Sequence, residues 1–433
     1  MKERDYLDVL GFQQWTPMQE DYLRETSPYT MLLSETGSGK TLAFLVHLLK
    51  FHHLREKSGI LVLSPTRELA MQLHEVLQSL RSGLRSVLCY GGHSFKDEQD
   101  QLQAHPEIVI ATPGRMLDHL RRKSPGLEAF DQLVLDEYDK ILELGFYDQL
   151  EDILGYMNGF EQIQLVSATE IERLPDALKT YSFVRKDYRE SKEEASREIS
   201  WIRCPDQDKF RELLNLLWMY QGKPVMVFCT HREAVDRISE HLWEAGKSHA
   251  AFHGGLEQKV REESIIRFNE GIADCLLSTD LASRGLDLEE VACVIHYQLP
   301  GNEKDYIHRN GRTGRMGKEG KVHVLLTAED QLPEYMESIE ELKLDPGQES
   351  GCFETPKLDL LYLDLGRKDK IRKMDIVGAL TGSIGVPNAA IKKILIRDRY
   401  SYLVVDRDGF GPYRKSCQKM QIKKKNCRLR SCR

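Results

Sequence analysis

A glycine-rich loop ending in lysine and threonine is the strongest sign of chemistry in this chain. It reads Ser34-Glu-Thr-Gly-Ser-Gly-Lys-Thr41 and separates an apolar run from a helical pattern. Glycines let backbone N–H groups turn toward phosphate oxygens, and the start of the next helix adds partial positive charge. We expect Lys40 to neutralise the β and γ phosphates of ATP and the Thr41 hydroxyl to hold Mg²⁺. The remaining predicted phosphate contacts are Thr36, Gly37, Ser38 and Gly39.

Two adjacent carboxylates follow the apolar run 133–135. A nucleotide-bound Mg²⁺ needs an anionic ligand, and a water that attacks phosphate needs a base. Asp136 is the predicted metal ligand and Glu137 the predicted base. The alternative is an exposed acidic pair without a catalytic role.

A third candidate lies at Tyr306-Ile-His-Arg-Asn-Gly-Arg-Thr-Gly-Arg315. A guanidinium can fork onto γ-phosphate oxygens and stabilise the charge that develops during transfer. We expect Arg312 and Arg315 to act in this way, and we include His308 among the catalytic candidates. The alternative is a basic surface loop that binds nucleic-acid phosphates.

Composition limits the classes of protein that can carry these groups. The chain has 433 residues, of which 41% are hydrophobic and 30% charged, so we expect two to four folded domains rather than disorder. No apolar stretch is long enough for a membrane helix, and the charged N-terminus does not resemble an export signal. Nine scattered cysteines without a CxxC pair fit neither a disulfide framework nor a zinc site, which favours the cytoplasm.

Charge is distributed unevenly along the chain. Residues 357–433 hold 20 of the 61 Lys and Arg but only 7 of the 68 Asp and Glu, so their formal charge is +13 against −20 for the remainder. A basic module on an acidic body suggests that the tail contacts a polyanion. The alternative is a solvated charged face.

Alternating apolar runs and helical patterns indicate the elements that position these groups. They predict an α/β chain in which two parallel-sheet domains, 1–188 and 200–345, are joined by a charged linker, 189–199. A second linker, 346–356, leads to a small α+β module over 357–433 with four strand candidates.

With these residues in place, about 6–345 resembles the DEAD-box ATP-dependent RNA helicases, which implies two RecA-like domains. Gly11-Phe12 and Thr16-Pro-Met-Gln19 resemble the adenine-reading Q motif, so the resemblance implies adenine contacts from Phe12 and Gln19. Ser167-Ala-Thr169 resembles the motif that couples hydrolysis to strand separation, which adds Ser167 and Thr169 to the catalytic candidates.

Further motifs carry implied RNA and ATP contacts. Pro65-Thr-Arg-Glu-Leu-Ala70, Gly91-Gly92, Thr112-Pro-Gly-Arg115, Gln258 to Arg261, Ser278-Thr-Asp280 and Arg284-Gly-Leu-Asp287 all resemble family motifs. The implied ATP contacts are Gly285 and Asp287. The implied RNA contacts are Pro65, Thr66, Arg67, Gly92, Thr112, Pro113, Gly114, Arg115, Arg261 and Thr279.

Several positions depart from the family pattern, beginning with Trp15, where proline is usual. Tyr138 stands in the name-giving tetrapeptide where alanine is usual, Asn310 replaces an apolar residue, and Glu170 follows Ser-Ala-Thr where an apolar residue is common. We expect hydrolysis to persist and turnover or coupling to change.

The tail is similar to the C-terminal module of DbpA-type bacterial helicases, which implies an RRM-like fold. The resemblance rests on Arg367-Lys-Asp-Lys-Ile371, Gly378 to Gly382 and Ile391 to Ile394, and it implies RNA contacts from Arg367, Lys368 and Lys370. Tyr362, Tyr400 and Tyr402 can stack on bases or can simply be sheet residues.

The resulting hypothesis is a monomeric cytoplasmic ATPase that locally unwinds or remodels structured RNA. The resemblance implies large-subunit ribosomal RNA as the target, during ribosome assembly. Two alternatives stay open: an ATP-gated RNA clamp that does not unwind, favoured by Tyr138 and Asn310, and a DNA helicase.

Overall fold

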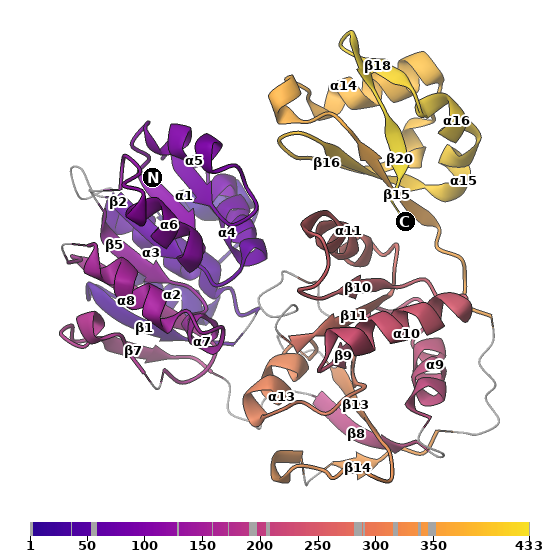
Figure 1. Cartoon of the computed structure of the whole chain (residues 1–433), viewed down its shortest axis with the longest axis horizontal. Coiled ribbons are helices and arrows are strands. Elements are labelled where there is room, and N and C mark those ends of the chain that lie inside the picture. The colour runs from indigo at the N-terminus through magenta and orange to yellow at the C-terminus, as the bar shows by residue number, and fades with distance from the viewer. Residues whose placement is uncertain are drawn as a thin grey trace. The chain divides into compact units, whose positions relative to one another are not determined.

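The computed structural model in Figure 1 describes residues 3–35, 37–52, 59–127, 130–157, 159–171, 173–189, 197–204, 208–280, 288, 291–314, 319–336, 339–344 and 352–432. The chain divides into two compact units, one drawn from residues 1–195 and the other from 196–284 and 288–433. Within the described ranges, no helix has the length and apolar character needed to cross a membrane.

Seven parallel strands form the sheet of the first unit, in the order β3-β4-β2-β5-β6-β1-β7. They are β1 (Tyr29–Leu33), β2 (Gly59–Leu63), β3 (Ser86–Cys89), β4 (Ile108–Ala111), β5 (Phe130–Leu135), β6 (Gln162–Ser167) and β7 (Val184–Asp187). Every residue of β2, β4 and β6 is buried, as expected for parallel strands covered on both faces.

Helices cover both faces of this sheet. One core joins the sheet to α1 (Glu3–Leu10), α2 (Pro17–Leu23), α3 (Lys40–His52) and α4 (Arg67–Ser79). The other joins it to α5 (Phe95–Leu102), α6 (Pro113–Arg121), α7 (Tyr138–Glu143), α8 (Tyr147–Gly155) and the 3₁₀ turn η1 (Asp176–Leu178). Successive residues of β2 and β5 alternate between the two cores because side chains alternate across a strand.

The second unit contains another seven-stranded parallel sheet, in the order β10-β11-β9-β12-β13-β8-β14. Its strands are β8 (Arg197–Arg203), β9 (Val225–Cys229), β10 (Ala250–Phe252), β11 (Cys275–Thr279), β12 (Cys293–His296), β13 (Gly320–Leu326) and β14 (Glu340–Glu341). Its helices are α9 (Lys209–Met219), α10 (Arg232–Glu244), α11 (Gln258–Asn269), α13 (Glu303–Asn310) and the turn η3 (Glu334–Met336).

A small module completes the second unit. Four antiparallel strands, ordered β16-β17-β15-β20, are β15 (Leu358–Leu363), β16 (Ile391–Ile396), β17 (Ser401–Asp406) and β20 (Leu429–Ser431), and a hairpin pairs β18 (Met420–Ile422) with β19 (Lys425–Cys427). The connections contain α14 (Lys373–Gly378), α15 (Arg407–Phe410), α16 (Arg414–Cys417), a π turn at η5 (Ala379–Ile384), and 3₁₀ turns at η4 (Arg367–Asp369), η6 (Asn388–Ala390) and η7 (Gly411–Tyr413). One face of the sheet packs on these connections.

The predicted fold class is confirmed, since two parallel α/β sheets precede a small antiparallel α+β module. Three strands of the two parallel sheets, and the hairpin strand β18 of the module, were absent from the predicted set. Strand β7 is largely exposed, β14 has only two residues, and β8 begins at Arg197, inside the predicted linker 189–199. All three lie at or next to a sheet edge, where the apolar signal is weakest. Most of both predicted linkers lies outside the described residues.

Candidate active site

The glycine-rich loop joins β1 to α3, and Lys40 is the first residue of that helix. Gly37 and Gly39 have φ values of +85° and +86°, which L side chains rarely adopt. A Cβ atom on Gly39 would also lie 2.5 Å from Nε2 of Gln19. The loop therefore needs glycine at position 39 for both backbone and packing reasons.

Gln19 fastens the predicted adenine motif to this loop. Its Nε2 donates a hydrogen bond of 3.1 Å to the carbonyl of Gly39. Its Oε1 accepts from the Thr16 N–H at 3.0 Å, and its own N–H donates to Thr16 Oγ1 at 3.3 Å, so the two residues form a capping box at the start of α2. Phe12 lies before this helix and is 55% exposed, so its ring is accessible to a ligand.

The two carboxylates lie where β5 ends, and both are buried. Glu137 caps α7 with φ +50° and ψ +50°, an unfavourable conformation for a residue with a side chain. Its carboxylate pairs with Lys40 Nζ at 2.9 Å and also with Lys140. The structure thus brings the phosphate-loop lysine and the predicted base into direct contact.

Burial and these lysines separate the pKa values of the two acids. Burial alone would raise the pKa of Glu137, but the ammonium groups of Lys140 and Lys40 lower it well below its usual range. For Asp136, burial and the neighbouring Glu137 raise the pKa to about 7, against partial compensation by the lysines. Asp136 Oδ1 is buried without a hydrogen-bond partner in the described structure. A buried, under-compensated carboxylate oxygen beside a phosphate loop fits a hard cation such as Mg²⁺.

A hydrogen-bond network links the carboxylate loop to the Ser-Ala-Thr motif. Thr169 Oγ1 donates to Asp139 Oδ2 at 2.8 Å, and the Thr169 N–H donates to the same oxygen at 3.2 Å. Ser167 Oγ donates to the Thr169 carbonyl at 2.7 Å. Ser167 and Thr169 were among the predicted site residues, and Asp139, which accepts both hydrogen bonds from Thr169, was not.

Tyr138 points away from these polar groups. Its side chain is fully buried in the core of the first unit, and its hydroxyl donates to the Arg173 carbonyl at 2.6 Å. The Tyr138 ring therefore does not occupy the place of the hydrogen bond between Asp139 and Thr169. Glu170, another departure, is exposed and pairs with Arg185 and Arg189.

In the second unit the arginine motif forms α13 and the turn after it. Arg309 is buried and makes a bidentate pair with Asp280, through Nε at 2.5 Å and Nη2 at 2.7 Å. Asn310 is buried too, and its Oδ1 accepts from His296 Nε2 at 2.8 Å, which explains a polar residue at that position. Arg309 was not among the predicted site residues, although it lies in the same motif.

The other predicted residues of this unit are placed only in part. Arg312, His308 and Thr279 are buried. Arg261 lies on α11 with its guanidinium 5.1 Å from the Phe252 ring centroid. The predictions for Thr36, Gly285, Asp287 and Arg315 concern positions outside the described residues.

The predicted RNA-contact motifs of the first unit lie at helix starts. Thr66 Oγ1 caps α4 by accepting from the Leu69 N–H, and it directly follows Pro65. A Cβ atom on Gly92 would lie 2.9 Å from Nη1 of Arg67, so that guanidinium lies against the glycine backbone. Thr112, Pro113 and Gly114 open α6.

Arg115 is held by a buried carboxylate that sequence reasoning missed. Its Nε donates to Glu98 Oε2 at 2.6 Å and its Nη2 to the His93 carbonyl at 2.8 Å. The same Glu98 carboxylate accepts from the Tyr90 N–H at 3.2 Å and bonds His119 Nε2 at 2.8 Å. One carboxylate therefore fastens the segments around Gly92 and Arg115 to each other.

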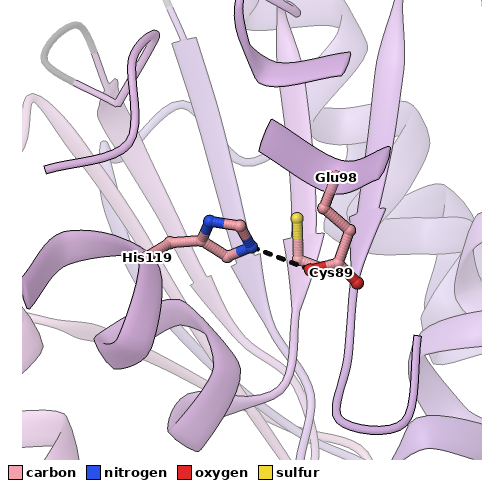
Figure 2. Close-up of side chains that lie close together, drawn as sticks. All are labelled: Cys89, Glu98 and His119. Carbon is pink, nitrogen blue, oxygen red and sulfur yellow. Dashed lines mark hydrogen bonds and ion pairs between the residues drawn. The ribbon is translucent and has the colours of Figure 1, made fainter. Parts of the chain in front are cut away.

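Figure 2 shows Cys89, Glu98 and His119 close together, a set of ligand types that also occurs in metal sites. All three side chains are buried. Burial raises the pKa of the Cys89 thiol, so the thiolate that metals require is disfavoured. The Arg115 cation already neutralises Glu98. We interpret the cluster as a structural hydrogen-bond centre.

In the C-terminal module, Arg367, Lys368 and Lys370 are exposed in and beside the turn η4. The three tyrosines are placed differently. Tyr402 is fully buried, whereas Tyr362 and Tyr400 are half-buried with ring centroids 5.4 Å apart. The basic residues are accessible to RNA in this structure, and the Tyr402 ring is not.

Comparison with known proteins gives matches along nearly the whole chain. Residues 16–177 match the DEAD/DEAH box helicase family, 208–317 the helicase conserved C-terminal domain, and 360–431 the DbpA RNA binding domain. The ATP-dependent RNA helicase DbpA of Escherichia coli (strain K12) is 33% identical over 98% of this chain and 96% of its own length. The protein of the same name from Bacillus subtilis (strain 168) is 30% identical over 94% and 92%.

A solved structure, S. cerevisiae Dbp5 bound to RNA and ADP BeF3, matches with a TM-score of 0.66 at 26% identity. The match covers 78% of this chain and 92% of the Dbp5 chain. It supports tandem RecA-like domains as the framework for the phosphate loop, the carboxylates and the arginine motif. The chain therefore belongs to the DEAD-box family of ATP-dependent RNA helicases and carries the RNA-binding domain of the DbpA type.

Proposed function

We propose that this RNA-dependent ATPase remodels structured RNA of the large ribosomal subunit during ribosome assembly. The observation that carries the target is the module over 357–433, whose charge is +13 and whose match is the DbpA RNA binding domain. Each phosphate contact releases bound counterions, so such a module gains affinity from any folded RNA. Target choice then depends on this module, since helicase cores contact mainly the sugar-phosphate backbone.

For the chemistry, we propose that Lys40 and Thr41 hold the phosphates and Mg²⁺ of ATP, with Asp136 as the protein's carboxylate ligand. When bound, Mg²⁺ neutralises charge on the β and γ phosphates. Among the described residues Asp136 Oδ1 is buried and has no hydrogen-bond partner, which supports this assignment. Gln19 and Phe12 are the proposed adenine contacts, because Gln19 already hydrogen bonds the phosphate loop.

Glu137 is the proposed base, and its ion pairs with Lys40 and Lys140 suggest how ATP binding makes it a stronger base. Without nucleotide, Lys40 and Lys140 both stabilise the charged carboxylate, which makes it a weak base. Phosphates compete for Lys40, so binding removes one of the two cations and raises the proton affinity of Glu137. Lys140 remains as its anchor.

Arg312 and Arg315 are the proposed arginine fingers, with His308 in the same motif. We do not propose Arg309 as a finger, because its Nε and Nη2 pair with Asp280 and its Nη1 donates to the Gln298 carbonyl. RNA contacts are proposed for Arg67, Thr112 and the other motif residues named above.

An ATP-gated clamp is the second candidate, and the structure gives it less support. Tyr138 packs in the core and Asn310 pairs with His296, so neither departure displaces a polar contact of the motifs. Steady-state ATP hydrolysis with and without RNA tests this point. Rapid RNA-stimulated turnover with strand separation supports a helicase, and negligible turnover of a tightly bound complex supports a clamp.

Crosslinking in cells followed by sequencing of the bound RNA tests the target. We expect reads to concentrate in one region of large-subunit ribosomal RNA, and an even distribution over messenger RNA would overturn the proposal. We also propose that the protein is a monomer, that it is cytoplasmic and that RNA rather than DNA stimulates it. Sedimentation tests the oligomeric state and cell fractionation tests the location. Competition of DNA against RNA for stimulating ATP hydrolysis tests the nucleic acid.

A further inference from the structure

The aromatic face of the C-terminal sheet is covered by a helix of the preceding domain. Tyr402 and Val404 of β17 and Leu360 of β15 form one buried apolar cluster with Ile266 and Ile272, which lie in and just after α11. Tyr362 and Tyr400 pack at its margin. The opposite face of the same sheet packs on the module's own helices. Both faces are therefore buried.

Polar contacts surround this apolar cluster. Glu262 of α11 accepts from Arg397 Nε at 2.6 Å and from the Tyr400 hydroxyl at 2.6 Å. Glu270, at the end of the helix, pairs with Lys393 of β16. The acidic members come from the helix and the basic members from the module, in keeping with the opposite charges of body and tail.

A cation–π contact adds to the interface at the start of the helix. Lys259 Nζ lies 3.8 Å from the Tyr362 ring centroid. Lys259, Glu262, Ile266 and Glu270 are three or four residues apart, so they share one face of α11. Arg261 lies on the same helix, and its guanidinium stands over Phe252 of the adjoining sheet.

We propose that the tyrosine face of the module is a docking surface for α11 and not a platform for RNA bases. The module and the second RecA-like domain then move as one body. Because docking fixes α11 relative to the module, RNA held by the module reaches Arg261 of that helix in a fixed orientation. RNA binding must then use other surfaces of the module, such as the turn η4 and the β18–β19 hairpin, where Arg367, Lys368, Lys370, Lys423, Lys424 and Lys425 are exposed.

The test measures docking directly, in the full chain and without ATP. Fluorophores are attached through genetically encoded amino acids at two exposed positions, Met219 in α9 and Met374 in α14, so that the native cysteines stay unlabelled. Single-molecule energy transfer should give one narrow distance distribution. Glu262→Arg and Arg397→Glu should each raise the undocked fraction about 10-fold or more, since each removes a charge-assisted hydrogen bond. The double variant Glu262→Arg/Arg397→Glu should restore the narrow distribution.

Two matched variants make the result specific. Glu198→Arg, which reverses an exposed glutamate paired with Lys321 in the same domain, should leave the distribution unchanged. Tyr400→Phe keeps the ring but loses the hydroxyl bond to Glu262, so it should loosen docking while retaining any stacking.

RNA decides between docking and base stacking. A synthetic hairpin with a single-stranded extension should bind without broadening the distribution. A broad distribution in the unmodified chain, no effect of either single reversal, or release of the module by RNA would each overturn the proposal. The distances are measured without turnover, so loss of ATPase activity or of the ribosomal target would leave this result standing.

Discussion

Replacing Glu137 by glutamine should separate ATP binding from hydrolysis. In the nucleotide-free structure Lys40 pairs with Glu137 at 2.9 Å inside the protein, so the phosphates of ATP must take Lys40 from that carboxylate. A charge-assisted hydrogen bond contributes about 1.5 to 3 kcal/mol. Removing this competitor should therefore tighten ATP binding by about 10-fold, and by about 150-fold as an upper limit. Loss of a general base should slow turnover by about 10² to 10⁴-fold.

The assay pairs the dissociation constant of a fluorescent ATP analogue with RNA-stimulated steady-state hydrolysis. Glu20→Gln is the matched control, because Glu20 forms an exposed ion pair with Arg24 that is worth little. Thermal unfolding checks the fold, since Lys40 and Lys140 lose their buried partner. Unchanged turnover in Glu137→Gln would refute the assignment of the base. Weaker nucleotide binding by a folded variant would refute the competition for Lys40.

Four further predictions concern other parts of the chain. Lys40→Ala should abolish nucleotide binding or turnover, because the phosphates lose their cation; retention of both in a binding and hydrolysis assay would contradict its role. Arg312→Ala should lower turnover by about 10³-fold or more while changing ATP affinity little, and equal losses would place it in ground-state binding. The pKa values of His296 and His323 are lowered to about 3 and about 4, mainly by burial, so the unfolded chain takes up protons below about pH 6.5 while the folded chain does not. The free energy of unfolding should therefore decrease as the pH is lowered, by about 2 kcal/mol per histidine at pH 5 relative to pH 7. Denaturant titrations of His323→Gln should show a smaller decrease over the same pH range. Removing residues 357–433 should abolish preference for one structured RNA and flatten the salt dependence by about 0.7 per lost phosphate contact, and an unchanged slope would place RNA targeting in the core.

Short segments carry the most predictable parts of this protein. Gly37, Gly39, Lys40 and Thr41 form a phosphate loop wherever a strand precedes them and a helix follows, because the backbone itself supplies most of the contacts. Asp136 and Glu137 are similarly predictable, since the end of a buried parallel strand is the edge at which such sites assemble.

Residues that act through distant partners were not predictable. Glu98 appears in the sequence as one acid in a charged helix, yet it accepts hydrogen bonds from Tyr90, Arg115 and His119, which lie in two other segments of the first unit. In the sequence Arg309 resembles its neighbours Arg312 and Arg315, and its pairing with Asp280 is evident only in the structure. Most of these partners are many residues away in the sequence, so they cannot be inferred from the local spacing of residues.

Residue types and local periodicity are enough to predict the order of the domains, a nucleotide site and the basic character of the tail. They do not show which residues pack against a side chain that could equally be exposed, because that depends on segments far apart in the chain. Alternation along β15 and β17 shows that Tyr362 and Tyr402 share a face of the sheet, but it cannot show whether water, RNA or protein covers that face. Here α11 covers it, because the burial of Ile266 and the charges of Glu262 and Glu270 complement this surface.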